Sequence, residues 1–228
     1  MKTKKTKIIC TMGPATDDPK VLEKMIKAGM NVARFNFSHG SYEDHEKRLN
    51  EVIEVRNRLN QPIATLLDTK GPEIRLGDFE NPEGAVISSG DKYTLTPTPC
   101  MGNEKKCYIN YEGLPADVSV GTTILINDGL ISMKVEKVNG TDINCVVIDG
   151  GLLTNHKGVN VPNVELKMPY LSSRDMADLQ FGANHDFDFV AASFVRSATD
   201  VTILRNYVEA IGWKNVKIIS KIENEQGV

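Results

Sequence analysis

Long apolar runs are absent from this chain of 228 residues. A membrane-spanning helix needs about 18 or more consecutive apolar residues, and the sequence contains no such stretch. The basic start of the chain leads into an apolar run of only Ile8, Ile9 and Cys10, which is too short for the apolar region of a signal peptide. These absences predict a cytoplasmic protein that has no membrane partner.

A large charge of either sign is also absent. The 27 Lys and Arg residues nearly balance the 30 Asp and Glu residues, and no long basic tract or zinc-finger spacing occurs, so nucleic acid is not an expected partner. The four cysteines form no CxxC pair, which predicts free thiols. Cys100 and Cys107 could begin a metal site, but no further ligands lie near them in the sequence.

Two glycine-rich phosphate-binding motifs are missing as well. No GxGxxG follows the first expected strand and GxxxxGK[ST] occurs nowhere, which removes support for dinucleotide-binding and P-loop folds. Instead, the outer parts of the chain alternate short apolar runs with helical periodicity, a pattern typical of a parallel sheet with helical crossovers. The expected strands are 7–13, 31–37, 63–68, 188–194 and 216–223, and the expected helices are 17–29, 41–59, 172–183 and 199–211. The first strand is expected to be buried.

The middle of the chain lacks this alternation and shows no convincing helix. Short β-rich runs there are separated by turn signals such as Asn139-Gly140 and Asp149-Gly150-Gly151, which indicates a small antiparallel barrel or sandwich. We therefore expect an α/β fold, a partial (β/α)8 TIM barrel of five strands that is interrupted by an inserted all-β barrel domain. The expected barrel parts are residues 1–71 and 170–228, and the insertion is 72–169.

Polar residues concentrate where the expected parallel strands end, among them Arg34, Asn36, Asp68, Lys221 and Glu223. In β/α barrels the chemistry takes place at these ends. Cations can offset phosphate charge, carboxylates can bind a divalent metal, and amide and hydroxyl oxygens suit a monovalent ion. This combination is what phosphoryl transfer requires.

Each of these residues also has a structural interpretation. Arg34 could form an ordinary salt bridge, His39 could cap the following helix, and Asp68 could cap a turn through its own backbone. Lys221 and Glu223 are two residues apart, which places them on the same side of a strand. That side could face solvent or the mouth of the barrel.

Six blocks of sequence, taken together and in this order, resemble a known family. They are KIICTMGP (7–14), NVARFNFSHG (31–40), LLDTKGPEIR (66–75), KGVNVP (157–162), DFVAASFVR (188–196) and IISKIENE (218–225). Over its whole length the chain closely resembles the N-terminal portion of bacterial-type pyruvate kinases. The β-rich insertion after the third strand resembles that family's lid domain.

The resemblance implies a phosphotransferase that converts phosphoenolpyruvate and ADP into pyruvate and ATP, the last step of glycolysis, with Mg²⁺ (or Mn²⁺) and K⁺ as cofactors. It implies that Arg34 binds the substrate phosphate and that Lys221 stabilises charge on the transferring phosphoryl group and the enolate. The implied metal ligands are Asn36, Ser38, Asp68 and the Thr69 carbonyl for potassium, with Glu73 fitting the potassium-dependent branch of the family, and Glu223 for magnesium. The implied nucleotide-binding residues are Asn36, Phe37, Ser38, His39, Arg75 and Lys157.

The resemblance further implies a lid that closes over the nucleotide about hinges at Gly71-Pro72 and Met168-Pro169, and a homotetrameric full-length protein. The family's second magnesium carboxylate, on its sixth strand, has no counterpart in the 228 residues, so we expect the isolated chain to be inactive. The alternative is a non-catalytic chain that binds nucleotide or a complementary half. A different barrel enzyme acting on phosphoenolpyruvate is disfavoured by the LDTKGPEIR block.

Overall fold

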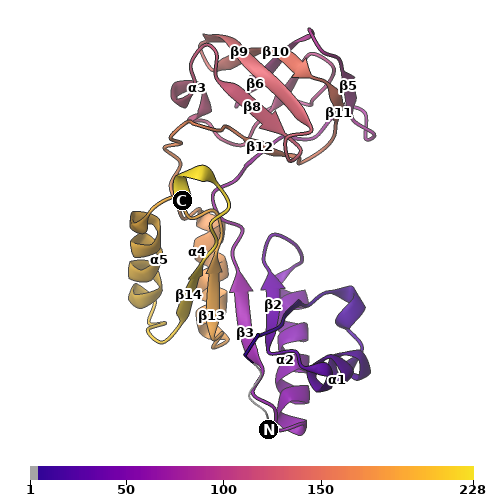
Figure 1. Cartoon of the computed structure of the whole chain (residues 1–228), viewed down its shortest axis with the longest axis vertical. Helices are drawn as coiled ribbons and strands as arrows, with labels where there is room; N and C mark the ends of the chain where they lie inside the picture. The colour runs from indigo at the N-terminus through magenta and orange to yellow at the C-terminus, as the bar shows by residue number, and fades with distance from the viewer. Residues whose placement is uncertain (1–4) are drawn as a thin grey trace. The chain divides into compact units, whose positions relative to one another are not determined.

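The computed structural model describes residues 5–228, so the first four residues of the basic N-terminal segment lie outside the described part. The described chain forms two compact units (Figure 1). The first, the α/β unit, contains the chain up to Pro72 together with Tyr170–Val228, and the second, the β unit, is Glu73–Pro169. Each unit has its own hydrophobic core.

A five-stranded parallel sheet forms the centre of the α/β unit, with the strand order β1-β2-β3-β13-β14 (Figure 1). Its strands are β1 (Ile9–Thr11), β2 (Val32–Asn36), β3 (Ala64–Asp68), β13 (Phe189–Ala192) and β14 (Lys217–Ser220). Strands β3 and β13 are hydrogen-bonded neighbours although the whole β unit separates them in sequence. The sheet is therefore continuous across the insertion, and the mixed α/β character expected from the sequence is confirmed.

The α-helices that accompany this sheet each begin after a side chain that caps them. They are α1 (Pro19–Ala28), α2 (Tyr42–Arg58), α4 (Ser173–Asn184) and α5 (Ala198–Ala210). The capping residues Asp18, Ser41, Ser172 and Ser197 each accept a hydrogen bond from a backbone N–H of the first turn. These four helices confirm the ones expected from the sequence. None of the helices within residues 5–228 is both long and apolar enough to cross a membrane.

The helices pack on one face of the sheet. Buried strand residues of that face, Ala33, Phe35, Leu67 and Val190, share a core with Leu22, Leu49 and Leu204 from α1, α2 and α5. Because side chains alternate along a strand, their neighbours in sequence point to the opposite face. Arg34, Asn36 and Asp68 therefore lie on the face away from the helices.

Expectations about the ends and edges of this sheet are partly wrong. The first strand is expected to be buried, but Ile9 is 50% exposed, because it is in register with Val32 and therefore lies on the face of Arg34, away from the helices. The last strand ends at Ser220, so Lys221 and Glu223 lie beyond it and strand alternation does not fix their directions. The strand expected over 188–194 stops at Ala192, since Phe194 has a positive φ of 52°.

The β unit contains a seven-stranded sheet in the order β4-β12-β8-β9-β10-β6-β7 and a two-stranded sheet of β5 and β11 (Figure 1). The strands are β4 (Ile74–Arg75), β5 (Ala85–Ile87), β6 (Lys92–Thr96), β7 (Lys106–Tyr108), β8 (Thr123–Ile126), β9 (Ile131–Asn139), β10 (Asp142–Asp149), β11 (Gly151–Leu153) and β12 (Gly158–Asn160). An isolated bridge between Leu76 and Ile109 joins the segments that follow the two outer strands, β4 and β7. The expectation that this part of the chain contains no helix is wrong. Residues Leu114–Asp117 form α3, one short helical turn that begins at a buried leucine.

Candidate functional site

A buried carboxylate lies between two cations at the carboxyl end of β3. The side chain of Asp68 is only 2% exposed. Its Oδ2 atom accepts a 2.6 Å hydrogen bond from Arg34 Nε, and its Oδ1 atom accepts a 3.0 Å bond from Lys221 Nζ. Arg34 also donates to Thr11 Oγ1 at 2.6 Å. The parallel sheet thus gathers residues from β1, β2, β3 and the segment after β14.

In this cluster the two cations are partly exposed to solvent and the carboxylate is buried. A carboxylate as buried as Asp68 needs compensation by nearby cations or donors, and it has both. The side chains of Arg34 and Lys221 are 30% and 29% exposed. The cluster therefore presents positive charge outward and keeps its negative charge inside. The salt bridge considered as the structural interpretation of Arg34 is present. The Asp68 carboxylate, considered as the cap of a turn, is bonded to the side chains of Arg34, Lys221 and Ser193.

Ser193, directly after β13, completes the surroundings of Lys221. Its hydroxyl accepts a 2.9 Å hydrogen bond from Lys221 Nζ and donates to the Thr69 carbonyl at 2.6 Å. The Ser193 side chain also lies 3.2 Å from Asp68 Oδ1. Sequence reasoning assigned Ser193 no role. The available signal was its position one residue beyond a strand, among the polar residues that follow the sheet.

Glu223 lies next to Lys221 although neither belongs to a strand. Its Oε1 atom is 3.3 Å from Lys221 Nζ, and its Oε2 atom accepts a 3.0 Å hydrogen bond from the backbone N–H of Phe194. Of the two interpretations left open by the sequence, the structure favours the one in which Lys221 and Glu223 face the strand ends. Arg34, Asp68, Lys221 and Glu223 are therefore linked into one chain of contacts.

The segment Asn36–Gly40 begins with the last residue of β2 and continues into the turn that follows it. Asn36 Oδ1 accepts a 3.1 Å hydrogen bond from the Ser38 N–H. Phe37 is only 2% exposed and its ring stacks on His45 with 4.2 Å between ring centroids, so Phe37 anchors the turn in the core. The interpretation that His39 caps the next helix is wrong, because Ser41 is the capping residue. The His39 carbonyl instead contacts His45 Nε2 at 2.9 Å, and burial lowers the pKa of His45.

Arg75 and Lys157 belong to the β unit. Arg75 forms two hydrogen bonds with Glu73, of 2.6 and 2.7 Å, and a third with the His156 carbonyl at 2.7 Å. The bonds to Glu73 raise the pKa of Arg75. Lys157 comes directly before β12, whose Gly158 pairs with Arg75. The structure thus places these two residues beside each other in the β unit, whereas the cluster around Asp68 belongs to the α/β unit.

A metal ion at the cluster would have few carboxylates as ligands. Within residues 5–228, no group of three or more His, Cys, Asp or Glu side chains is arranged to hold a metal ion. Magnesium is usually bound through one or two carboxylates, with substrate phosphates and water completing its coordination. Glu223, partly exposed at the strand ends, fits such a role. The oxygens of Asn36, Ser38, Asp68 and Thr69 are the donor type that potassium requires. They lie at or just beyond the ends of β2 and β3, where Asn36 and Asp68 are in register.

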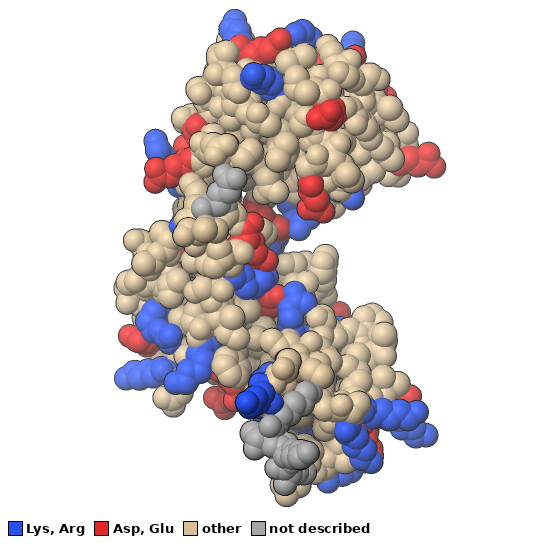
Figure 2. Space-filling model, viewed as in Figure 1, with Lys and Arg blue, Asp and Glu red and all other residues tan. Residues whose placement is uncertain are grey.

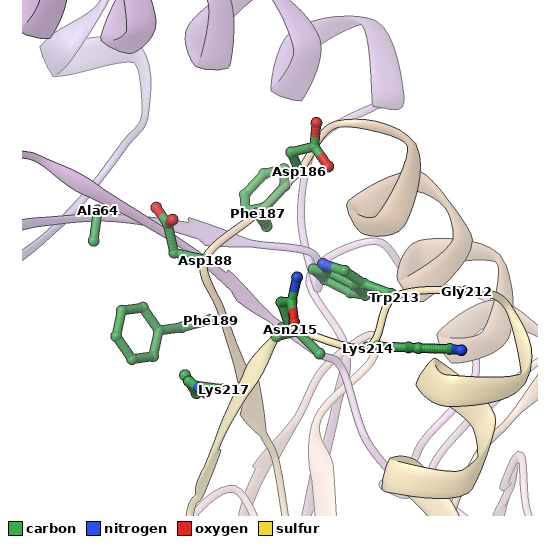
Figure 3. A pocket seen from close by; sticks show the side chains of 11 residues that line it. Ala64, Asp186, Phe187, Asp188, Phe189, Gly212, Trp213, Lys214, Asn215 and Lys217 are labelled. Carbon is green, nitrogen blue, oxygen red and sulfur yellow. The ribbon is translucent and has the colours of Figure 1, made fainter.

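A cavity of about 460 Å³ lies at the opposite end of the sheet. Ala64, Phe189 and Lys217, which begin β3, β13 and β14, line it. Figure 3 shows that Asp186, Asp188, Lys214 and Lys217 bring both signs of charge to its lining. Charges of both signs are likewise interspersed on the face of the β unit seen in Figure 2. Neither the cavity nor this face of the β unit favours a ligand of one charge. The cluster around Asp68, which presents positive charge outward, is therefore the candidate site.

Comparisons with known proteins agree on one family. The family profile described as "Pyruvate kinase, barrel domain" matches residues 3–228. Pyruvate kinase from Clostridium acetobutylicum is 46% identical over 225 residues, which cover 98% of this chain and 47% of the relative. Pyruvate kinase from Geobacillus stearothermophilus is 46% identical over 228 residues, 99% of this chain and 38% of the relative. The chain thus spans about half or less of the length of these curated relatives.

Proposed function

Because this chain belongs to the pyruvate kinase family, we propose that it provides the phosphoenolpyruvate site for phosphoryl transfer to ADP, which gives pyruvate and ATP in the last step of glycolysis. The observation that carries this proposal is the buried Asp68 carboxylate held between Arg34 and Lys221, both of which remain partly exposed. Two cations directed to one point suit a ligand that carries both a phosphate and a carboxylate. The position at the carboxyl ends of parallel strands agrees with where β/α barrels bind substrates.

Arg34 and Lys221 act on the substrate anion in this proposal. The guanidinium of Arg34, fixed by Asp68 and Thr11, binds the phosphate of phosphoenolpyruvate. Lys221, held by Asp68, Ser193 and Glu223, offsets the charge on the transferring phosphoryl group and on the enolate oxygen. Both cations are already oriented before substrate arrives, so little reorganisation is needed when charge moves.

Metal ions are assigned by the donor types present. Glu223 would hold magnesium or manganese, which supplies charge neutralisation on substrate oxygens. Asn36, Ser38, Asp68 and the Thr69 carbonyl would hold potassium. For Asp68 this means that a third cation joins the two it already contacts, which is compatible with a carboxylate that accepts several ligands.

The nucleotide is assigned to two groups of residues. Asn36, Phe37, Ser38 and His39 would contribute the end of β2 and the turn after it, with the buried Phe37 anchoring that turn. Arg75 and Lys157 would contribute cations from the β unit. We further propose that the insertion over residues 72–169, which contains the β unit, acts as a lid that closes over the nucleotide and excludes water, about hinges at Gly71-Pro72 and Met168-Pro169. A homotetramer of the longer family protein belongs to the same proposal.

The proposal is tested by binding of phosphoenolpyruvate to the chain, measured by isothermal titration calorimetry with Mg²⁺ and K⁺ present. Removing one charged hydrogen bond costs about 1.5–3 kcal/mol, so Lys221→Met and Arg34→Met should each weaken binding roughly 10- to 100-fold. Lys217→Met is the matched control, since Lys217 is an exposed lysine at the start of β14, away from the strand ends that carry the site. Equal losses in Lys217→Met and Lys221→Met would contradict the assignment, as would an undiminished affinity in Lys221→Met.

A further inference from the structure

One peptide group beside the candidate site is held at both of its ends. The carbonyl of Ser193 accepts a 3.0 Å hydrogen bond from the hydroxyl of Tyr170, and the N–H of the same peptide, on Phe194, donates to Glu223 Oε2 at 3.0 Å. Tyr170 is 4% exposed, so water does not readily replace its hydroxyl. The carboxylate proposed as the magnesium ligand is thus connected through one rigid peptide to a buried tyrosine.

The backbone of Phe194 shows that this peptide needs to be held. Its φ of 52° lies in the left-handed region, which a bulky side chain rarely adopts. Such conformations persist when surrounding interactions determine them, and they cluster at functional sites. Donation to the carbonyl end of a peptide also polarises the group and strengthens its N–H as a donor. Tyr170 therefore acts on both the orientation and the strength of the contact with Glu223.

Tyr170 also lies where the chain returns from the β unit to the α/β unit. The outgoing chain passes the same serine at Gly71, whose φ is 71° and where an added Cβ would lie 2.9 Å from both Cβ and O of Ser193. The Gly71 N–H is anchored by a 3.0 Å bond to Asp175 Oδ1. Both chain crossings are therefore fixed against Ser193, whose hydroxyl contacts Lys221.

We propose that Tyr170 is a positioning residue for Glu223. Its hydroxyl fixes the Ser193–Phe194 peptide, and the peptide N–H in turn fixes the carboxylate that holds the divalent cation. This inference rests on the proposed function only for the metal; the hydrogen-bonded connection itself is independent of it. An outer partner of a metal ligand commonly changes metal affinity by about 10- to 100-fold when it is removed.

The test compares Tyr170→Phe with a matched control, Tyr207→Phe, in the 228-residue chain. Tyr207, in α5, also donates its hydroxyl to a backbone carbonyl, that of Met176, at 3.0 Å. The first readout is the ¹H–¹⁵N NMR signal of the Phe194 amide without metal. In Tyr170→Phe we expect this proton signal to move upfield and its exchange with solvent to accelerate, while Tyr207→Phe leaves both unchanged. In Glu223→Gln the same signal should also move, because the acceptor loses its charge.

The second readout is Mn²⁺ affinity, measured by electron paramagnetic resonance. We expect a loss of about tenfold in Tyr170→Phe and none in Tyr207→Phe. A Phe194 amide signal that is unchanged in Tyr170→Phe would overturn the proposal, and so would an unchanged Mn²⁺ affinity when Glu223→Gln weakens it. If Glu223→Gln leaves Mn²⁺ affinity unchanged, the metal role of Glu223 is wrong, and the Phe194 signal alone then decides whether Tyr170 positions its carboxylate.

Discussion

Asp68 is the residue on which the cluster depends, and Asp68→Asn tests this directly. The substitution keeps the shape of the side chain but leaves Arg34 and Lys221 without their shared counter-charge. It also turns an amide N–H₂ toward the donors of one of the two cations. Breaking a fully buried ion pair costs roughly 3–5 kcal/mol. Because the two cations are 30% and 29% exposed and water can partly compensate them, we expect a loss of about 2–3 kcal/mol in the free energy of unfolding.

The assay is urea unfolding followed by tryptophan fluorescence. Trp213 is the single tryptophan of the chain and lies in the core of the α/β unit, 7% exposed, so its signal reports that unit. The urea midpoint should fall by on the order of 1 M. The control is Glu23→Gln in the same unit, whose partners Lys27 and Arg58 are exposed at the surface, and which should leave the midpoint nearly unchanged. A loss below about 0.5 kcal/mol for Asp68→Asn would refute the view that Asp68 holds the two cations together.

Two further predictions concern the same unit and the same assay. Gly71→Ala should lower the urea midpoint more than Gly212→Ala, because both glycines have a positive φ but only the Cβ at Gly71 would meet neighbouring atoms, at 2.9 Å; equal effects would contradict the close approach to Ser193. Burial raises the pKa of Asp178 above its ordinary value of 3.8, so the folded state binds the proton more tightly and this carboxyl favours folding less as pH rises through that range. Asp178→Asn should therefore gain stability relative to the parent chain as pH rises above 3.8, and a difference that stays constant with pH would contradict this sign.

Local sequence signals were sufficient to predict most of the helices and strands of the α/β unit. Helix α1 begins after Asp18 with Pro19 in its first turn and ends at Gly29, which adopts a φ of 113°, and these are short-range preferences of the chain. The exposure of Ile9 in β1 could not be predicted in the same way, since an apolar run does not reveal which face of the sheet the helices cover. That property depends on how the helices pack on the sheet.

The candidate site was only partly accessible to sequence reasoning. The residue types at the strand ends indicated anion and metal chemistry, but Lys221 and Glu223 were placed by strand alternation, and β14 ends before either of them. The contacts of Ser193 with Lys221 and of Tyr170 with Ser193 join residues 28 and 23 positions apart. Such contacts follow from how the sheet and its connecting segments pack, and no local pattern encodes them.

The proposed phosphoryl transfer at this cluster is tested most directly by pyruvate formation. We would fuse the chain to the part of the Clostridium acetobutylicum relative that it does not match and measure pyruvate from phosphoenolpyruvate and ADP, with Mg²⁺ and K⁺ present. We expect turnover in the fusion, loss of turnover with Lys221→Met, and retention with Lys217→Met. Turnover that persists in Lys221→Met would show that the cluster around Asp68 is not where the phosphoryl group is transferred.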